Sequence, residues 1–203
     1  MTGIPQFIAR ARALFRLDPK SPRIREDLIA LMNGLPPDDS SARRLASKGS
    51  GWQTEDLCTT SDFSVSLFMI PRGHAIPFHD HPSMSVLMRA LSGHLEVQAY
   101  DWTQRHAWGG LGRHTYTVSM NVLTDTLAVE RDHGNIHQVV ARDDCVFVDF
   151  AFPPYSDQPG RRCAFYRVDG EQIVDDERPT RFLAIERPDN DDVPRRSGTA
   201  SDM

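Results

Sequence analysis

Two histidines separated by one residue, His79 and His81, are the part of this sequence best suited to chemistry. Successive side chains of an extended strand point to opposite faces, so these two imidazoles share a face and lie close enough to bind one ion. Such a pair is also common on the polar face of an exposed strand. A metal site therefore requires further ligands from elsewhere in the chain.

His137, in the stretch DHGNIHQVV, is the best third candidate because it opens a predicted strand with Val139 on the same face. Three neutral imidazoles leave a divalent iron with its full charge and about three open positions in an octahedral shell, so that substrate and dioxygen can both bind. Imidazole also suits zinc, copper and nickel, and zinc on three histidines would make a hydrolytic site. The ligand type alone leaves the metal open.

The remaining five histidines are interpreted as structural or solvated. His106 and His114 fall in HAWGGLGRH, which its Trp and Gly content predicts to be a loop. His133 precedes Gly134 and is close enough to His137 to serve as a spare ligand.

The elements that must position these histidines are mostly strands. Apolar residues alternate with other residues over 63–70 and 95–100, and HQVVARDDCVFVDFAF indicates two strands joined by an acidic turn at 142–144. Short strands separated by Gly, Pro and Asp turns favour an antiparallel sandwich or small barrel.

The first 35 residues show helical periodicity instead and predict two short helices. Ser21 is the expected N-cap of the second, with Pro22 at its first position, and Asn33 and Gly34 end it. We therefore expect an N-terminal helical segment at 1–40 and a strand-rich domain at 41–186. Residues 187–203 lack apolar periodicity and are expected to be a disordered tail.

The composition is that of an ordinary soluble domain, with 39% hydrophobic and 25% charged residues in a chain of 203. A net charge of -5 without basic runs gives no reason to expect a nucleic-acid or anionic-membrane partner. No apolar run approaches the roughly 20 residues that cross a bilayer. The three cysteines form no metal or disulfide pattern, which favours a reducing compartment, and we expect a cytoplasmic monomer.

Three separated segments together resemble the thiol dioxygenase family that contains cysteamine dioxygenase and the plant cysteine oxidases. They are IPFHDHPSMSVLMRALSGHLEVQAYDW, GNIHQV and FVDFAFPPYSDQPGRRCAFYRV, within about residues 60 to 168. The resemblance implies a cupin barrel (a double-stranded β-helix, or jelly-roll) and a non-haem Fe(II) on His79, His81 and His137. It also implies oxidation of a thiol to a sulfinic acid with O2. Ser85 and Val86 occupy the positions at which the general cupin motif carries a glutamate.

The resemblance assigns roles to two more residues. Asp149 falls on an acid of the family that could orient the thiol or pair with a substrate amine, and Tyr155 on a tyrosine that could hydrogen-bond bound substrate or oxygen. The alternatives are a solvent-facing Asp149 and a packed Tyr155 at the rim. The family's cysteine–tyrosine crosslink is not expected here, because Cys163 and Tyr166 point to opposite faces of a strand.

The leading hypothesis is an iron thiol dioxygenase acting on a cysteamine-like aminothiol or on the N-terminal cysteine of a peptide. A free-cysteine dioxygenase is less favoured, because no arginine of the motifs is placed in an obvious position to clamp a carboxylate and Arg89 is the nearest candidate. A non-catalytic cupin that binds a metal or small ligand, as a sensor or storage protein, and a cupin oxygenase of other chemistry are the alternatives.

Overall fold

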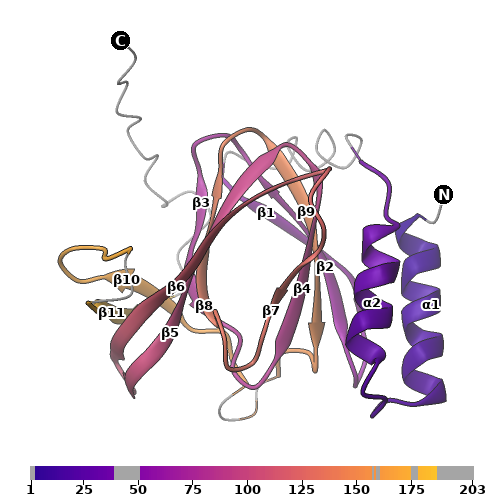
Figure 1. The fold of residues 1–203 in the computed structure, drawn as a ribbon, viewed down its shortest axis with the longest axis horizontal. Helices are drawn as coiled ribbons and strands as arrows, with labels where there is room; N and C mark the ends of the chain where they lie inside the picture. Colours follow the sequence, from indigo (N-terminus) through magenta and orange to yellow (C-terminus); the bar gives the residue numbers. More distant parts are fainter. Residues whose placement is uncertain (1–2, 39–50, 157, 159–160, 175–177, 187–203) are drawn as a thin grey trace.

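The computed structural model describes residues 3–38, 51–156, 158, 161–174 and 178–186. Within this part of the chain, two helices precede eleven strands (Figure 1). Their bounds are α1 Ile4–Leu17, α2 Ile24–Asn33, β1 Gln53–Thr59, β2 Ser64–Ile70, β3 Ala75–Asp80, β4 Ser85–Ser92, β5 His94–His106, β6 Gly109–Asn121, β7 Leu127–Val129, β8 Ile136–Ala141, β9 Cys145–Phe152, β10 Phe165–Val168 and β11 Thr180–Ile185.

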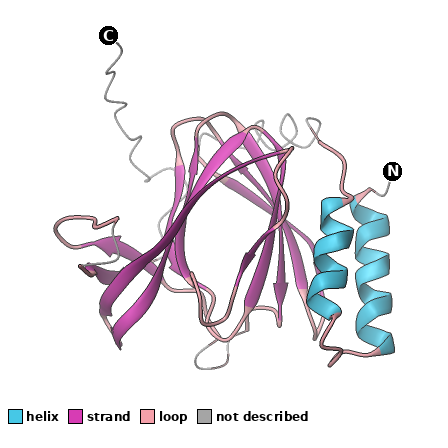
Figure 2. Ribbon diagram, in the orientation of Figure 1, coloured by secondary structure: helices cyan, strands magenta, loops and turns pink. Residues whose placement is uncertain are grey.

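The strands form two sheets in which neighbouring strands are antiparallel (Figure 2). One sheet has five strands in the order β1-β2-β9-β4-β7, and the other closes into a barrel of β10, β11, β6, β5, β8 and β3. The predicted fold class is confirmed, because the protein is mainly β, closes a barrel and begins with a short helical segment. The strands predicted at 63–70, 95–100 and on either side of 142–144 are present as well.

The helices α1 and α2 lie together against one side of the strands, at the end of the molecule opposite β10 and β11 (Figure 1). Phe7, Ala11 and Phe15 of α1 are buried at helical spacing. Phe15 packs against Phe63 with the ring centroids 5.2 Å apart, and Phe150 of β9 stacks on Phe63 at 4.8 Å. The helical hairpin is therefore part of the hydrophobic core.

The predicted start of the second helix is wrong by two residues. Helix α2 begins at Ile24 with Arg23 as its N-cap, while Ser21 lies in a turn closed by the Ile24 amide donating to its carbonyl at 3.1 Å. The Ser21 hydroxyl accepts the Arg23 amide within this turn, at 3.3 Å, instead of capping the helix. The predicted end is confirmed, since Gly34 is the C-cap.

The prediction of a loop at HAWGGLGRH is also wrong, because β5 and β6 run through it and leave only a two-residue turn, Ala107 and Trp108. The glycines in this stretch allow neighbouring strand backbones to come close together. A Cβ atom on Gly109 would lie 2.0 Å from the carbonyl oxygen of Phe182, and one on Gly110 would lie 2.0 Å from that of Gln104. Only glycine allows the backbones to come this close.

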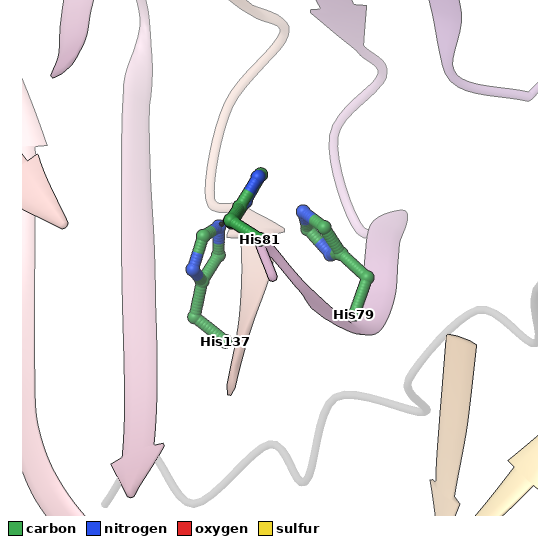
Figure 3. A group of neighbouring side chains, drawn as sticks. All are labelled: His79, His81 and His137. Carbon is green, nitrogen blue, oxygen red and sulfur yellow. Dashed lines mark hydrogen bonds between the residues drawn. The ribbon is translucent and has the colours of Figure 1, made fainter. Parts of the chain in front are cut away.

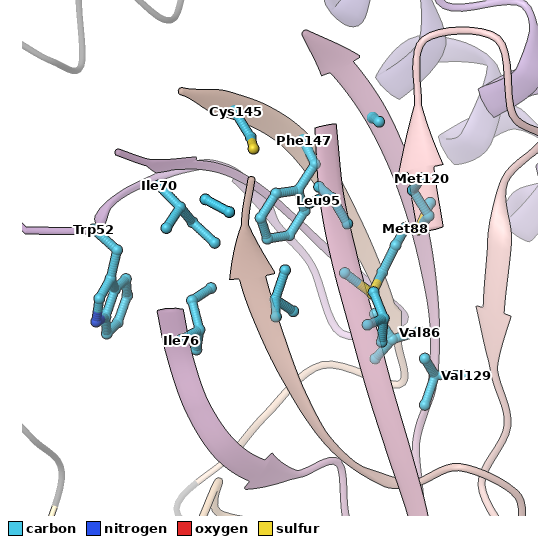
Figure 4. Packing of buried hydrophobic residues seen from close by; sticks show 14 of the residues in the cluster. Trp52, Ile70, Ile76, Val86, Met88, Leu95, Met120, Val129, Cys145 and Phe147 are labelled. Carbon is cyan, nitrogen blue, oxygen red and sulfur yellow. The ribbon is translucent and has the colours of Figure 1, made fainter. Parts of the chain in front are cut away.

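Apolar side chains of both sheets pack into one cluster, part of which Figure 4 shows. Phe147 of β9 and Met88 of β4 face Leu95 of β5 and Ile76 of β3 across it. This core fixes how the two sheets lie against each other. It thereby holds β3, which carries His79 and is followed directly by His81, and β8, which carries His137.

Two further expectations concern membrane-spanning segments and the division of the chain into domains. Among the residues described, no helix is both long and apolar enough to cross a membrane. The predicted boundary between residues 40 and 41 and the predicted tail at 187–203 fall outside the described residues, so the domain division stays a prediction.

Candidate metal centre

The three predicted metal ligands converge on one point. His79 of β3 lies directly opposite His137 of β8 in the strand register, and His81 follows the end of β3. Figure 3 shows the three imidazoles facing one another, with ring centroids 4.5 to 5.0 Å apart. Their ligand nitrogens lie within 4.8 Å of one another. In the described part of the chain, this is the group of His, Cys, Asp or Glu side chains that could hold a metal.

Hydrogen bonds on the outer side of two rings direct their Nε2 atoms inward. The Nδ1 of His79 donates to the carbonyl of Pro77 at 2.8 Å. The Nδ1 of His81 meets the hydroxyl of Tyr155, which itself donates to the carbonyl of Asp80 at 3.1 Å, so the imidazole is the donor to Tyr155. In both rings the proton sits on Nδ1 and the Nε2 lone pair is free for a metal.

Burial keeps the three imidazoles neutral. His79, His81 and His137 are 7%, 3% and 0% exposed, and desolvation lowers the pKa of each, well below the ordinary value for His81 and His137. The Nε2 atoms of His81 and His137 lie 3.4 Å apart. Three neutral, buried imidazoles with nitrogens this close together can share one ion, so the site suits a metal ion.

Asn135, which sequence reasoning missed, ties the two ligand segments together. Its side-chain amide donates to the backbone carbonyl of His81 at 2.8 Å, and its carbonyl accepts the backbone amide of His81 at 3.0 Å. Asn135 lies two residues before His137, so this double contact places His81 beside His137. Its position in the GNIH motif, beside the predicted ligand, was the sequence signal that could have identified Asn135.

A second missed residue, Asp80, anchors the opposite face of the histidine segment. Its fully buried carboxylate accepts hydrogen bonds from Arg105 at 2.7 Å, the Tyr166 hydroxyl at 2.8 Å and the Ala164 amide at 2.9 Å. Three donors of this kind compensate a buried negative charge. Asp80 therefore connects β3 to β5 and β10 directly behind the metal ligands.

We predict that Tyr166→Phe lowers the free energy of unfolding by about 2 kcal/mol, because it removes a buried hydrogen bond to a charged group. Tyr116→Phe is the matched control, since the buried Tyr116 hydroxyl has no hydrogen-bond partner among the described residues. Urea denaturation of both metal-free variants measures the difference. Equal stability of the two variants would contradict the anchoring role of Asp80.

A cavity of about 740 Å³ opens beside the histidines and is lined by His79, His81 and Asp149, among others. Asp149 therefore lies on the inner side of β9, as predicted. Its Oδ1 atom is buried without a partner among the described residues, and burial raises the pKa of its carboxyl group to about 8. At neutral pH this carboxyl group holds its proton and is available to a polar ligand. Val86, at the motif's glutamate position, lines the cavity as an apolar residue.

Tyr155 and Cys163 line the same cavity. Tyr155 as a whole residue is 37% exposed, while burial of its hydroxyl and the neighbouring Cys163 raise the pKa of Tyr155 well above its usual value. Tyr155 thus contacts His81, a predicted metal ligand, rather than packing only at a rim. Cys163 precedes β10, whereas Tyr166 lies on it and its hydroxyl donates to Asp80; the absence of a crosslink stays a prediction.

The two arginines of interest, Arg89 and Arg162, have different surroundings. Arg89 donates to the backbone carbonyls of Val122 and Thr124, whereas Arg162 lines the cavity. The expectation that no motif arginine stands in an obvious position to clamp a carboxylate stays a prediction, and Arg162 replaces Arg89 as the candidate that would overturn it. His133, the spare ligand, is exposed and lies 3.2 Å from the Asp101 carboxylate.

The family profile and the curated relatives that match this chain agree with each other. The profile of the PCO_ADO family matches residues 26–186. The chain is 31% identical to plant cysteine oxidase 2 of Arabidopsis thaliana, over 57% of this chain and 47% of that protein. It is 30% identical to a probable 2-aminoethanethiol dioxygenase of Dictyostelium discoideum, over 55% and 53%. The chain thus spans about half the length of the curated relatives it matches.

Among solved structures, one similar protein is an uncharacterized conserved protein with a double-stranded β-helix domain from Klebsiella pneumoniae. The TM-score is 0.43 at 15% identity, over 58% of this chain and 80% of that one.

Proposed function

This chain belongs to the PCO_ADO family, and we propose that it is an iron(II)-dependent dioxygenase that converts a thiol to a sulfinic acid. The observation that carries the proposal is the buried, neutral cluster of His79, His81 and His137 at the wall of a cavity. The relatives named as cysteine oxidase and 2-aminoethanethiol dioxygenase support thiol chemistry.

The three Nε2 atoms would hold the iron. When bound, it would supply open coordination positions at which a thiolate and dioxygen meet, while the thiol sulfur would supply the four electrons that reduce dioxygen. The protein's own contribution is positional: Pro77, Tyr155 and Asn135 fix the ligands, and apolar side chains such as Val86 restrict water.

We infer that the substrate carries an amine near its thiol. Asp149 shares the cavity with His79 and His81 and has an unpartnered buried oxygen. An ammonium group placed against this oxygen would favour the ionised carboxylate, and the carboxyl proton would leave to solvent. This contact would orient an aminothiol with its sulfur toward the histidines.

Tyr155 is proposed to position His81. Replacing it with phenylalanine leaves His81 Nδ1 without its oxygen partner, and we expect about a tenfold loss of iron affinity, the lower end for such supporting groups. Competition with a chromogenic chelator measures the affinity. An unchanged iron affinity with a raised KM for the thiol would instead assign Tyr155 to substrate contact.

The test of the proposed function is direct. Purified protein is analysed for metal, loaded anaerobically with Fe(II), and given oxygen with cysteamine, cysteine or a peptide that begins with cysteine. Mass spectrometry should show a gain of two oxygen atoms in the thiol. Tightly held zinc and no product from any thiol would favour the non-catalytic sensor or storage protein.

A free-cysteine dioxygenase is a second candidate because Arg162 lines the cavity and could bind a carboxylate. Turnover of cysteine well above that of cysteamine, lost in Arg162→Gln, would favour it. We further propose a cytoplasmic monomer without a nucleic-acid or membrane partner. Light scattering after gel filtration tests the monomeric state.

A further inference from the structure

The cavity is much larger than a small aminothiol. Its volume of about 740 Å³ lies in the range of sites for drug-sized ligands, about 300–1,000 Å³. A thiol with four or five heavy atoms displaces on the order of 100 Å³, judged from about 30 Å³ for each water. Most of the cavity would remain free beyond the reacting end of the substrate. A peptide that begins with cysteine would use this space.

A polar row leads from the metal site to the cavity mouth. Asp149 of β9, Ser66 of β2 and Asp56 of β1 lie directly opposite one another in the strand register, and all three line the cavity. The Ser66 hydroxyl donates to Asp56 Oδ1 at 2.8 Å. Thr54 and Ser64 add hydroxyl groups to the same wall. The row is thus continuous across three strands.

The length of this row matches a short peptide. Neighbouring strands lie about 4.8 Å apart, so Asp149 and Asp56 are separated by about 10 Å across two spacings. One residue of extended chain advances about 3.4 Å. With its amino group at Asp149, a peptide could therefore bring a long side chain of its second residue to Asp56.

The charges that line the cavity decide which side chain the second residue of the peptide should carry. Asp56 is exposed at the mouth, and in the described part of the chain its polar contact is the Ser66 hydroxyl, with no cation at ion-pair distance. Arg162 contributes a positive charge to another part of the lining, from the segment between β9 and β10. A cationic side chain at Asp56 and an anionic one at Arg162 are thus the competing outcomes.

We propose that Asp56 is a specificity-determining residue that favours peptides with an N-terminal cysteine followed by lysine or arginine. The inference rests on the proposed function, because that function places the thiol of the N-terminal cysteine at the metal site. The observation behind it is the polar row: Asp56 lines the cavity, lies in register with Ser66 and Asp149, and accepts the Ser66 hydroxyl at Oδ1. Arg162 has no such place in the register with Asp149.

The experiment compares Cys-Lys-Ala-Ala, Cys-Gln-Ala-Ala and Cys-Glu-Ala-Ala, all with amidated C-termini so that Arg162 meets no terminal carboxylate. We expect kcat/KM for the lysine peptide to exceed that for the glutamate peptide about tenfold at low salt. The ratio should fall to about twofold near 0.5 M salt, because exposed charges are screened.

Three variants assign the effect. Asp56→Asn should bring the ratio near one, and Asp56→Lys should reverse it. Asp62→Asn should keep the wild-type ratio: it removes the same charge from an exposed aspartate that also accepts a serine hydroxyl, at 3.4 Å, but does not line the cavity. Melting temperatures near that of the wild type show that each variant is folded.

Anaerobic calorimetry with Ser-Lys-Ala-Ala and Ser-Glu-Ala-Ala separates this inference from the proposed function, because these peptides bind without being oxidised. Preference for the lysine peptide in binding, lost in Asp56→Asn, supports the inference even if no thiol is oxidised, in which case the proposed function alone fails. Equal kcat/KM for the three cysteine peptides, or preference for glutamate, overturns the inference while the dioxygenase function stands.

Discussion

Replacing His137 with alanine is expected to lower iron affinity by at least 100-fold, which leaves the purified protein with almost no iron. His137 is fully buried, and its Nε2 lies 3.4 Å from that of His81. Loss of a group that only supports a ligand costs about 10- to 100-fold in metal affinity, so loss of a ligand should exceed that range. Elemental analysis of protein reconstituted anaerobically with Fe(II) measures the occupancy.

His133→Ala is the matched control, because His133 lies four residues earlier in the same segment but faces Asp101. It should retain iron at the wild-type level. Retention of iron in His137→Ala together with its loss in His133→Ala would make His133 the third ligand. Comparable thermal stability of the two metal-free variants shows that the difference comes from the metal site.

The strands and the three histidines could be predicted because their signals are local. Alternation of apolar residues marks β2 and β5, and two short apolar runs on either side of an acidic turn mark β8 and β9. The two-residue spacing of His79 and His81 fixes their common face, and the motif around Gly134 identifies His137. Each of these signals lies within a few residues, where backbone geometry alone decides the outcome.

The loop prediction at HAWGGLGRH failed because close contacts between strands decide the conformation, one of them with a residue distant in sequence. Gly109 and Gly110 have the composition of a loop, but they permit a strand to pass close to Phe182 and Gln104. A single sequence does not show which backbone will approach them. Intrinsic propensity is accordingly a weak guide wherever tertiary contact determines what fits.

The supporting residues of the site were missed for the same reason. Asp80 is satisfied by Arg105 and Tyr166, which lie 25 and 86 residues further along the chain. Arg162 lines the cavity beside residues of β1, β2 and β3, which lie more than 80 residues earlier in the chain. Resemblance to a family transfers the residues that match its motifs, whereas side chains particular to this chain require the structure.

The second large effect is expected at Asp149. Asp149→Asn should lower kcat/KM for cysteamine about 30-fold, because a hydrogen bond to a charged group contributes about 2 kcal/mol. The same variant should oxidise 2-mercaptoethanol, which has no amine, as fast as the wild type does. A uniform loss with both thiols would instead place Asp149 in support of the metal site.

Stability provides an independent measure of the Asp149 environment. Because burial raises the folded-state pKa from 3.8 to about 8, the native protein holds this proton where the unfolded chain has lost it. Stability must then fall as the pH rises between these two values. Asparagine does not titrate, so the free energy of unfolding of Asp149→Asn should increase relative to that of the wild type as the pH rises.

The metal-free protein is the one to use, because a bound divalent cation would lower the pKa of a nearby carboxyl group. The window from pH 6.5 to 8 avoids the histidines, whose lowered folded-state pKa values affect stability mainly below 6.5. We expect the stability difference to grow by about 1 kcal/mol over this window, less than the full 1.36 kcal/mol per pH unit because Asp149 is partly open to the cavity. Urea denaturation of both proteins at several pH values measures it, and a constant difference would show that Asp149 is already ionised at pH 6.5.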